Sequence, residues 1–309
     1  MDLRDKNVLV MMSTYNGELY ITDQIHSIMN QKSNCRIVLR IRDDGSKDKT
    51  CEIIKKLQID YGDRIELVEG QNLGYNGSFF ELIKTAEGYD YYAFSDQDDV
   101  WMEEKVQTAV EWMEKESLVY NGPVLYASTS YLVEDDLIPY GTTRKQQRKF
   151  TLYNTIVQNI CPGHNQFMNE KLVEIVKSKI ANAEVYVYDS WVTNLAMLFG
   201  RILFNNDPQT YYRQHNLNQL GAGAGSMKQL MTSIKHSKAG HGLKYRRQIE
   251  SFVELNKDDM DKTELKELLY FINSKTFFTR FLFAIRTKLH RQKRIESIAF
   301  RCAIIFGSF

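Results

Sequence analysis

The chain alternates between apolar runs of strand length and helix-period segments through about its first two thirds. Residues 7–13 (NVLVMMS) and 36–41 (RIVLRI) are the first two runs, and 64–69 and 89–94 follow. Between these runs, apolar residues recur every three or four positions, which is the spacing of one helix face. This repeated βα order predicts an α/β fold with a mostly parallel, Rossmann-like central sheet flanked by helices.

Composition excludes several classes of protein. The 309 residues carry 40 Lys/Arg and 39 Asp/Glu, so no overall charge favours nucleic acid as a partner. No apolar stretch approaches the roughly 20 residues that span a bilayer, and residues 1–13 do not resemble a signal peptide. The four cysteines form no C-x-x-C pair, which argues against a zinc site or a disulfide framework. We therefore expect a cytoplasmic protein.

Three polar loops follow predicted strands directly. They are TYNG at 14–17, RDDGS at 42–46 and SDQDDVW at 95–101. In open α/β sheets, ligands bind outside the carboxyl ends of the strands, so these loops predict a single site. The chain contains no P-loop, dinucleotide, zinc-protease or serine-hydrolase motif that would assign another chemistry.

The loop at 95–101 gathers three carboxylates within four positions, where like charges repel one another. Asp96 and Asp98 occupy alternate positions, so both can face one hard cation. Mg²⁺ and Mn²⁺ prefer oxygen ligands and bridge carboxylates to phosphates. A second interpretation is an acidic turn that caps a helix starting near Glu103, with Asp98 or Asp99 as the N-cap.

These motifs, taken together with NLGYNGSFFELIK, YDSW and YRQH, resemble the bacterial family two glycosyltransferases. The resemblance covers roughly residues 6–217 and is strongest to the rhamnosyltransferase branch. It implies a glycosyltransferase A fold and inverting transfer of L-rhamnose from dTDP-L-rhamnose. The acceptor would be a saccharide or a lipid-linked saccharide of cell-envelope polysaccharide synthesis. The alternatives are a UDP-hexose donor, or a nucleotide-sugar-binding protein without turnover.

The resemblance assigns the nucleotide to the first two loops. It implies that Ser13, Thr14 and Tyr15 line the nucleotide pocket, with the tyrosine ring near the base. Asp44 would accept a hydrogen bond from the pyrimidine N3–H. An alternative interpretation makes the two acids of RDDGS simple turn residues before the glycine.

The resemblance also assigns the diphosphate and an Mn²⁺ or Mg²⁺ ion to the acidic loop. Asp98 would ligate the metal, and Asp96 would bind near the ribose or the metal. Asp99 would either orient the donor sugar or cap the next helix. His215 would be a metal or diphosphate ligand, and Arg213 would neutralise phosphate.

The expected general base is Asp189, which removes the acceptor hydroxyl proton. Relatives usually have His-Asp-Trp-Trp at this position, whereas this chain has Tyr188 and Ser190 and keeps Trp191. An ordinary helix N-cap is the alternative role for this aspartate.

Two further segments carry candidate residues. The segment CPGHNQ (161–166) places His164 and Asn165 where relatives usually have a small-residue turn, so either residue is a candidate for sugar contact. The Gly- and Ala-rich segment 221–242 predicts a loop or lid over the diphosphate, with the cationic candidates Lys228, Lys235 and His236. The alternative is a passive linker.

We expect a catalytic domain over 1–220, this loop over 221–242, and a basic helical region over 243–309. Within that region, 275–294 holds seven Lys or Arg and no acid, with one apolar stripe at helical spacing. Such a helix is expected either to lie peripherally on the inner face of the cell membrane or to pack on the catalytic domain. The stripe consists of Phe278, Phe281, Leu282, Ile285 and Leu289.

Overall fold

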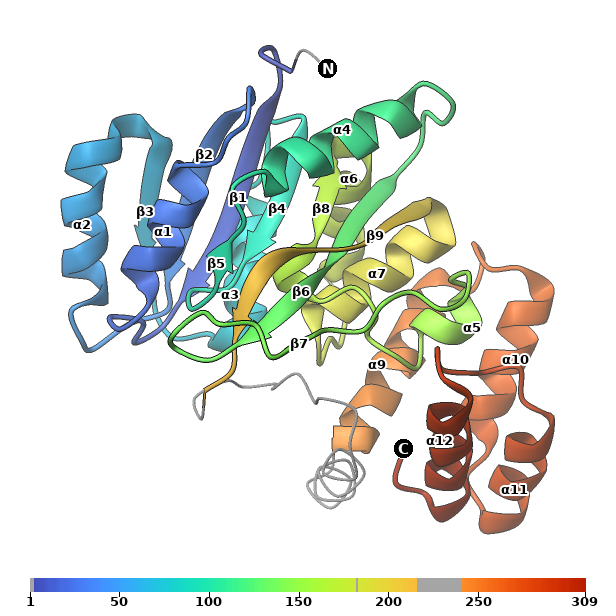
Figure 1. Ribbon diagram of the computed structural model, residues 1–309. Coiled ribbons are helices and arrows are strands. Elements are labelled where there is room, and N and C mark those ends of the chain that lie inside the picture. The colour runs from blue at the N-terminus through green and yellow to red at the C-terminus, as the bar shows by residue number, and fades with distance from the viewer. Residues whose placement is uncertain (1–2, 182, 216–240) are drawn as a thin grey trace.

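The computed structural model describes residues 3–181, 183–215 and 241–309, and it contains a curled central sheet with helices on both faces (Figure 1). The first half consists of β1 (Asn7–Thr14), α1 (Ile21–Met29), β2 (Arg36–Asp43), α2 (Thr50–Tyr61), β3 (Ile65–Glu69), α3 (Gly74–Lys84) and β4 (Tyr91–Ser95). Next come β5 (Val100–Trp101), α4 (Lys105–Ser117), β6 (Val124–Val133), β7 (Gly141–Thr142), α5 (Leu152–Thr155), β8 (Phe167–Asn169), α6 (Glu170–Ile180), α7 (Tyr188–Phe199) and β9 (Arg201–Arg213). The C-terminal helices are α9 (His241–Asn256), α10 (Lys262–Asn273), α11 (Phe277–Arg286) and α12 (Arg294–Phe306).

The sheet confirms the predicted α/β class. Its strand order is β3-β2-β1-β4-β8-β6-β9-β5, with β7 beside β6. The pairs β3–β2, β2–β1, β1–β4 and β6–β9 are parallel, whereas β8 is antiparallel to both β4 and β6. The short β8 therefore joins two parallel units into one continuous sheet.

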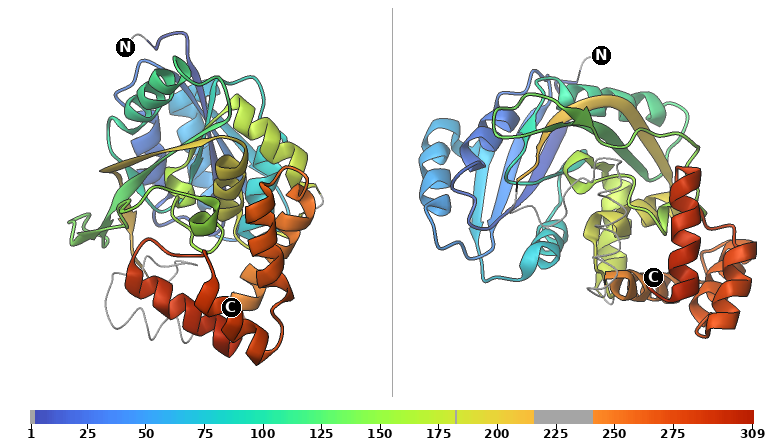
Figure 2. Two further views of the ribbon diagram at one scale, coloured as in Figure 1. Left: turned by 90° about the vertical axis from the view of Figure 1, so that its right-hand side faces the viewer. Right: turned by 60° about the horizontal axis from the view of Figure 1, so that its bottom comes forward.

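Strand β1 shows why its sequence is apolar at nearly every position. Val8, Val10 and Met12 belong to the core on the side of α1, α2 and α4, whereas Leu9 and Met11 belong to the core on the side of α3, α6 and α7. Because successive side chains of a strand point to opposite faces, a strand covered on both sides is apolar throughout. Figure 2 shows helices on both faces of the sheet.

The apolar runs at 123–128 and 131–135 are separated by polar residues but form one strand, β6. The polar run Ser128–Ser130 breaks the apolar pattern, but these residues are fully buried and β6 continues through them. The register with β9 shifts at this point, which is a β-bulge or similar irregularity. The hydroxyls of Thr129 and Ser130 are hydrogen-bonded within the fold, which makes them compatible with a strand interior, so the polar run did not mark a strand end.

The C-terminal helices pack on the α/β core. Buried residues of α9, α10, α11 and α12 belong to the same apolar cluster as those of α3, α6 and α7. The ring of Phe252 in α9 meets Trp191 in α7 edge to face, with centroids 5.3 Å apart. The predicted loop at 221–242, with Lys228, Lys235 and His236, lies outside the described residues apart from its last two positions, and the domain boundaries stay a prediction.

The prediction of one amphipathic helix over 275–294 was wrong in extent. Helix α11 ends at Arg286, and Thr287 is extended. The carboxylate of Glu267 in α10 accepts hydrogen bonds from the Thr287 hydroxyl (2.6 Å) and the Lys288 backbone N–H (2.8 Å). Because these bonds stabilise the chain after the helix end, Leu289 leaves the helical stripe and is buried.

Phe252→Ala tests whether the C-terminal helices and the α/β core unfold together. Removing this buried ring should lower the free energy of unfolding by about 3–5 kcal/mol, the usual cost of a large core truncation. Urea unfolding should keep a single transition. Leu243→Ala, at an exposed position of the same helix, serves as the control and should stay within about 0.5 kcal/mol of the unsubstituted protein. Two separate transitions would contradict a shared core.

Candidate active site

The three polar loops meet at one edge of the sheet, as the sequence predicts. In the parallel register Thr14 pairs with Asp43, and Met12 pairs with Ser95. The backbone N–H of Asp44 donates to the Thr14 carbonyl at 2.8 Å. The ends of β1, β2 and β4 therefore form one continuous polar rim.

Gln97 of the acidic loop holds the loop that follows β1. Its side-chain oxygen accepts hydrogen bonds from Thr14 Oγ1 (2.6 Å) and the Tyr15 backbone N–H (2.9 Å). Ser13 Oγ donates to Ser78 Oγ at 2.7 Å. The Tyr15 side chain is 44% exposed, so its ring is available to a ligand.

The two acids of RDDGS have different environments. The Asp43 carboxylate accepts the Gly45 backbone N–H at 3.0 Å and thus forms the turn, as the alternative interpretation has it. Asp44 is buried; its Oδ1 pairs with the Arg42 guanidinium and accepts the Leu73 backbone N–H at 2.8 Å. The arginine and the backbone amide fix the carboxylate, and its contact with a base stays a prediction.

The end of β9 lies against Asp98. His215 Nε2 is 2.9 Å from Asp98 Oδ2, and the imidazole stacks on Tyr20 with ring centroids 4.9 Å apart. The Arg213 guanidinium lies 4.9 Å from the same Tyr20 ring, pairs with Asp23 at 2.7 Å, and donates to the Asp98 carbonyl at 3.2 Å. The structure thus brings together the predicted residues Asp98, Arg213 and His215.

Asp96, Asp99 and His164 form a second cluster whose candidate ligand atoms all lie within 4.8 Å of one another. Asp99 Oδ1 accepts the Arg213 backbone N–H at 3.2 Å, whereas its buried Oδ2 has no hydrogen-bond partner. Burial and the neighbouring carboxylates raise the pKa of Asp99 above its ordinary value. The N-cap interpretation of the acidic turn is wrong, since the N-cap of α4 is Glu104.

His164 is a neutral imidazole facing this cluster. Burial and the charge of Lys105 lower the pKa of His164 to about 3. Its Nε2 is 2.9 Å from Ser130 Oγ, and its Nδ1 is 3.8 Å from Asp96 Oδ2. Carboxylates with a neutral imidazole and an unpartnered buried oxygen fit a divalent cation such as Mn²⁺.

Lys105, the first residue of α4, carries a fully buried amine beneath the acids. Its Nζ donates to the His164 carbonyl (2.7 Å), Asn165 Oδ1 (3.0 Å) and Thr210 Oγ1 (2.7 Å), and it lies 4.1 Å from the Trp101 ring. Three acceptors match the three N–H bonds of an ammonium group. Burial lowers the pKa of this amine, while the carboxylates of the cluster oppose that shift. The lysine thus places a positive charge beside the carboxylates of the acidic cluster.

Asp189 lies in the first turn of α7, and the N-cap of that helix is Val187. Asp189 Oδ2 accepts hydrogen bonds from Asn159 Nδ2 and from the Gly163 backbone N–H, both at 2.8 Å. Burial raises the pKa of this carboxyl despite these donors. A raised pKa makes the carboxylate a stronger base, and the ordinary N-cap role does not apply.

Tyr188 directly precedes Asp189 and is buried. Its ring stacks on Phe79 at 4.1 Å and meets Phe94 edge to face at 5.1 Å. A Cβ at Gly163 would lie 2.1 Å from the Tyr188 hydroxyl, so only glycine leaves room for this ring. The tyrosine is therefore packed tightly against the turn at Gly163, directly before Asp189 in the chain.

Gln97 and Lys105 were not singled out from the sequence. Lys105 begins the buried face of α4 that continues with Ala109 and Met113, and a lysine at the head of an apolar stripe is the signal that could have identified it. Gln97 carries no comparable signal, since its partners come from β1, far away in the sequence.

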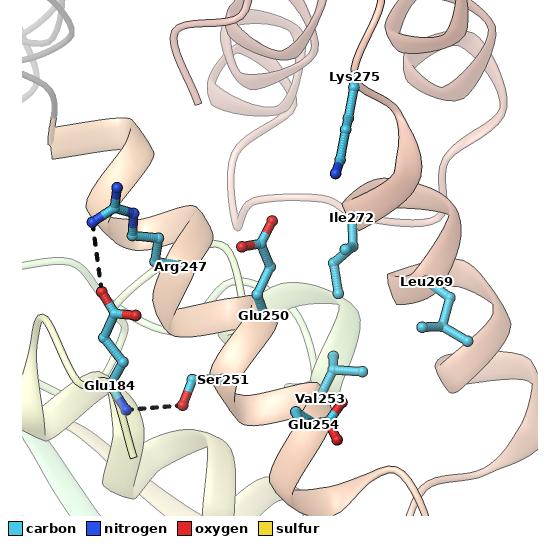
Figure 3. Close-up of a pocket in the computed structure, with 9 residues that line it drawn as sticks. All are labelled: Glu184, Arg247, Glu250, Ser251, Val253, Glu254, Leu269, Ile272 and Lys275. Atoms are coloured by element: carbon cyan, nitrogen blue, oxygen red, sulfur yellow. Dashed lines mark hydrogen bonds and ion pairs between the residues drawn. The ribbon is translucent and has the colours of Figure 1, made fainter. Parts of the chain in front are cut away.

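A separate pocket lies away from these residues, between α9 and α10 (Figure 3). Its volume is ≈ 570 Å³, and none of the predicted site residues lines it. Glu184 is held there by Ser251 Oγ at 2.9 Å and by Arg247 at 3.8 Å. These contacts fix the segment that leads to α7.

A family model described as glycosyl transferase family 2 matches residues 9–175. The dTDP-rhamnosyl transferase RfbG of Shigella flexneri is 31% identical over 225 residues, covering 68% of this chain and 74% of that protein. The UDP-Glc:alpha-D-GlcNAc-diphosphoundecaprenol beta-1,3-glucosyltransferase WfaP of Escherichia coli is 29% identical over 136 residues, covering 43% of this chain and 49% of that protein.

Two solved structures share the fold. S. aureus TarS 1–349 in complex with UDP-GlcNAc aligns with a TM-score of 0.61 at 17% identity, over 97% of this chain and 81% of that one. The mannosyltransferase PcManGT from Pyrobaculum calidifontis, in complex with GDP-Man and Mn²⁺, aligns with a TM-score of 0.55 at 15% identity, over 100% of this chain and 77% of that one. The predicted glycosyltransferase A fold is confirmed.

Lys105→Met tests the counter-charge beneath the acids. The variant removes three buried hydrogen bonds and leaves the carboxylates without a neighbouring cation, so the free energy of unfolding should fall by about 3–5 kcal/mol. Lys115→Met, at an exposed position of the same helix, is the matched control and should change it by at most about 0.5 kcal/mol. Equal urea midpoints for the two variants would refute this role of Lys105.

Proposed function

Because this chain belongs to glycosyl transferase family 2, we propose that it transfers L-rhamnose from dTDP-L-rhamnose to a saccharide or lipid-linked saccharide acceptor, with inversion at the anomeric carbon. The choice of donor is supported by the similarity to RfbG, which covers two thirds of the chain. The similarity to WfaP favours a UDP-hexose as the second candidate donor.

The proposal rests chiefly on one observation. Two consecutive residues, Gly163 and His164, connect Asp189 to Asp96. The Gly163 backbone N–H donates to Asp189, and the imidazole of His164 faces Asp96 at 3.8 Å. One short turn thus holds the proposed base on one side and the proposed donor-binding acids on the other. Inverting transfer needs this arrangement, because the acceptor and the leaving diphosphate lie on opposite faces of the sugar.

The nucleotide is proposed to bind along the rim formed by β1 and β2. The exposed ring of Tyr15 offers a stacking surface for the base, and the fixed carboxylate of Asp44 offers an acceptor for its N3–H. Ser13 and Thr14 line this pocket. The diphosphate then extends toward Asp96, Asp98 and the end of β9.

Asp189 is proposed to take the proton of the acceptor hydroxyl. As that proton leaves, the acceptor oxygen forms its bond to the anomeric carbon, and the bond from this carbon to the diphosphate oxygen breaks. Asn159 and the Gly163 amide fix the orientation of the base through hydrogen bonds. The buried position of the carboxylate excludes bulk water from the proton that is transferred.

A divalent cation, Mn²⁺ or Mg²⁺, would be held by Asp98 and Asp96 with His215, while Asp99 and His164 offer adjacent ligand atoms. When bound, it would neutralise the charge that develops on the diphosphate. Asp99 also ties the loop to Arg213 and is proposed to orient the donor sugar. Arg213 is proposed to contribute positive charge near the phosphates.

Donor hydrolysis and transfer across a set of nucleotide sugars test the proposed activity. With Mn²⁺ or Mg²⁺ present, dTDP-L-rhamnose should be consumed faster than UDP-glucose, UDP-GlcNAc or GDP-mannose, and EDTA should abolish turnover. Faster consumption of a UDP-hexose would assign the second candidate donor. Tight binding of a donor without turnover, with every saccharide acceptor tried, would instead identify a non-catalytic binding protein.

Asp189→Asn separates chemistry from binding. The amide retains an oxygen that can accept the Asn159 and Gly163 hydrogen bonds but cannot take a proton, so kcat should fall by about 10²-fold or more. Donor affinity, measured by calorimetry, should stay nearly constant. Asp207→Asn, at an exposed position of β9, is the control. Transfer by Asp189→Asn at the unsubstituted rate would refute the base assignment.

Asp98→Asn should weaken donor binding, whereas Asp189→Asn should slow the chemical step. Losing a charged ligand should weaken Mn²⁺-dependent donor binding by at least about tenfold. Even residues that only hydrogen-bond to a metal ligand lower metal affinity by about that factor when they are replaced. Donor binding measured in EDTA should change much less. Asp60→Asn, on an exposed turn of α2, provides the control for a general charge effect. Identical metal dependence in both variants would exclude Asp98 as a ligand.

A further inference from the structure

The last two helices each expose an apolar face. On α11 this face comprises Phe278, Phe281 and Ile285, at positions i, i+3 and i+7, and on α12 it includes Ile295 and Ile298. These side chains are between 42% and 74% exposed. Phe277 and Phe306, at 59% and 76%, extend the two faces. Large side chains left in water on one stripe of a helix mark an interaction surface.

The exposed stripes are not the faces that hold the helices in the fold. Phe283 of α11 and Phe300 and Ile304 of α12 are fully buried in the shared core. They lie on the opposite side of each helix from the exposed stripe, according to helical spacing. The exposed apolar residues are therefore surplus to what folding requires.

The two helices form an antiparallel pair, so their stripes lie on neighbouring elements of the surface. Arg301 of α12 donates to the Thr287 carbonyl at the end of α11, at 3.1 Å. At the other end of the pair, the Arg280 side chain of α11 lies against Gly307, directly after α12. Figures 1 and 2 show the helices side by side. In Figure 1 they lie on the lower side of the molecule, the side toward which β1 runs.

The segment that forms these two helices is basic. Residues 275–309 contain eight Lys or Arg and a single acid, Glu296. That acid points inward, since it pairs with Arg144 at 3.3 Å and accepts a hydrogen bond from Gln158 at 2.8 Å. Arg286 and Lys293, in contrast, are exposed beside the stripes.

We propose that the α11–α12 surface docks on an anionic lipid bilayer, with its exposed phenylalanine and isoleucine side chains in the interfacial region and its basic side chains on the lipid headgroups. Apolar side chains surrounded by lysine and arginine match the chemistry of such an interface. A second copy of the chain is a poorer occupant, because an isologous contact would bring two sets of like charges together. In the described residues, no helix is long and apolar enough to cross a membrane, so this docking is peripheral. It goes beyond the proposed sugar transfer and is tested without measuring activity.

Vesicle sedimentation with the full chain tests the proposal. The protein should bind phosphatidylglycerol vesicles more tightly than phosphatidylcholine vesicles, and added salt should weaken the binding. Phe278→Ser with Phe281→Ser should reduce the partition coefficient by at least about tenfold through the loss of apolar burial. Ile59→Ser, at a position of α2 that is 83% exposed, is the matched control and should bind as the unsubstituted protein does.

The basic side chains are tested separately. Arg286→Gln with Lys293→Gln should weaken binding to phosphatidylglycerol by about fivefold for each charge removed, whereas Lys115→Gln on α4 should have no effect. All of these variants change exposed side chains, so their urea unfolding should match that of the unsubstituted protein.

Three outcomes would overturn the proposal. The first is a lack of binding to either vesicle. The second is equal binding by the unsubstituted protein and the α11 variants. The third is concentration-dependent dimerisation in analytical ultracentrifugation, abolished by Phe278→Ser with Phe281→Ser and accompanied by no vesicle binding, which would identify a second copy as the occupant.

Discussion

Negative charge concentrated at the end of a buried strand is the constraint on which the rest of the site depends. Asp96, Asp98 and Asp99 follow β4 directly, in the middle of a sheet covered on both faces. Carboxylates in that position repel one another and are costly to bury without compensation. The protein surrounds the loop with basic and polar groups from several elements of the fold.

The groups that face these acids come from three further parts of the fold. Lys105 lies at the head of α4, His164 in the turn before β8, and Arg213 and His215 at the end of β9. Lys105 also donates to residues of that turn and of β9, and so holds these elements together. The same contacts that balance the acids therefore fix the strands relative to one another. One consequence is that the geometry of the site and the stability of the second half of the sheet are coupled.

The C-terminal helices contribute to the site indirectly. Gln248 of α9 accepts hydrogen bonds from the backbone N–H groups of Tyr186 and Val187, both at 2.8 Å. Tyr75 and Asn76 of α3 hold the same segment through the Tyr186 carbonyl, at 3.0 and 2.7 Å. The start of α7, and with it Asp189, is thus fixed by two helices. The helices that expose apolar stripes outward belong to the same packed unit.

The order of strands and helices was determined by sequence pattern alone, because burial on both faces makes parallel strands apolar and leaves polar residues at their carboxyl ends. The same rule places Thr14, Asp43 and Asp96 at one rim of the sheet. What the sequence could not decide was which polar residues meet. Ser128–Ser130 looked like an interruption, and Leu289 looked like part of a helical stripe, because the partners that bury them lie far away along the chain.

The pairings of Lys105 with the turn at His164, and of His215 with Asp98, likewise depend on crossovers that bring α4, β8 and β9 together. Local periodicity carries information about the near neighbours of a residue, whereas charge compensation in a buried site is decided by contacts that only the tertiary structure creates.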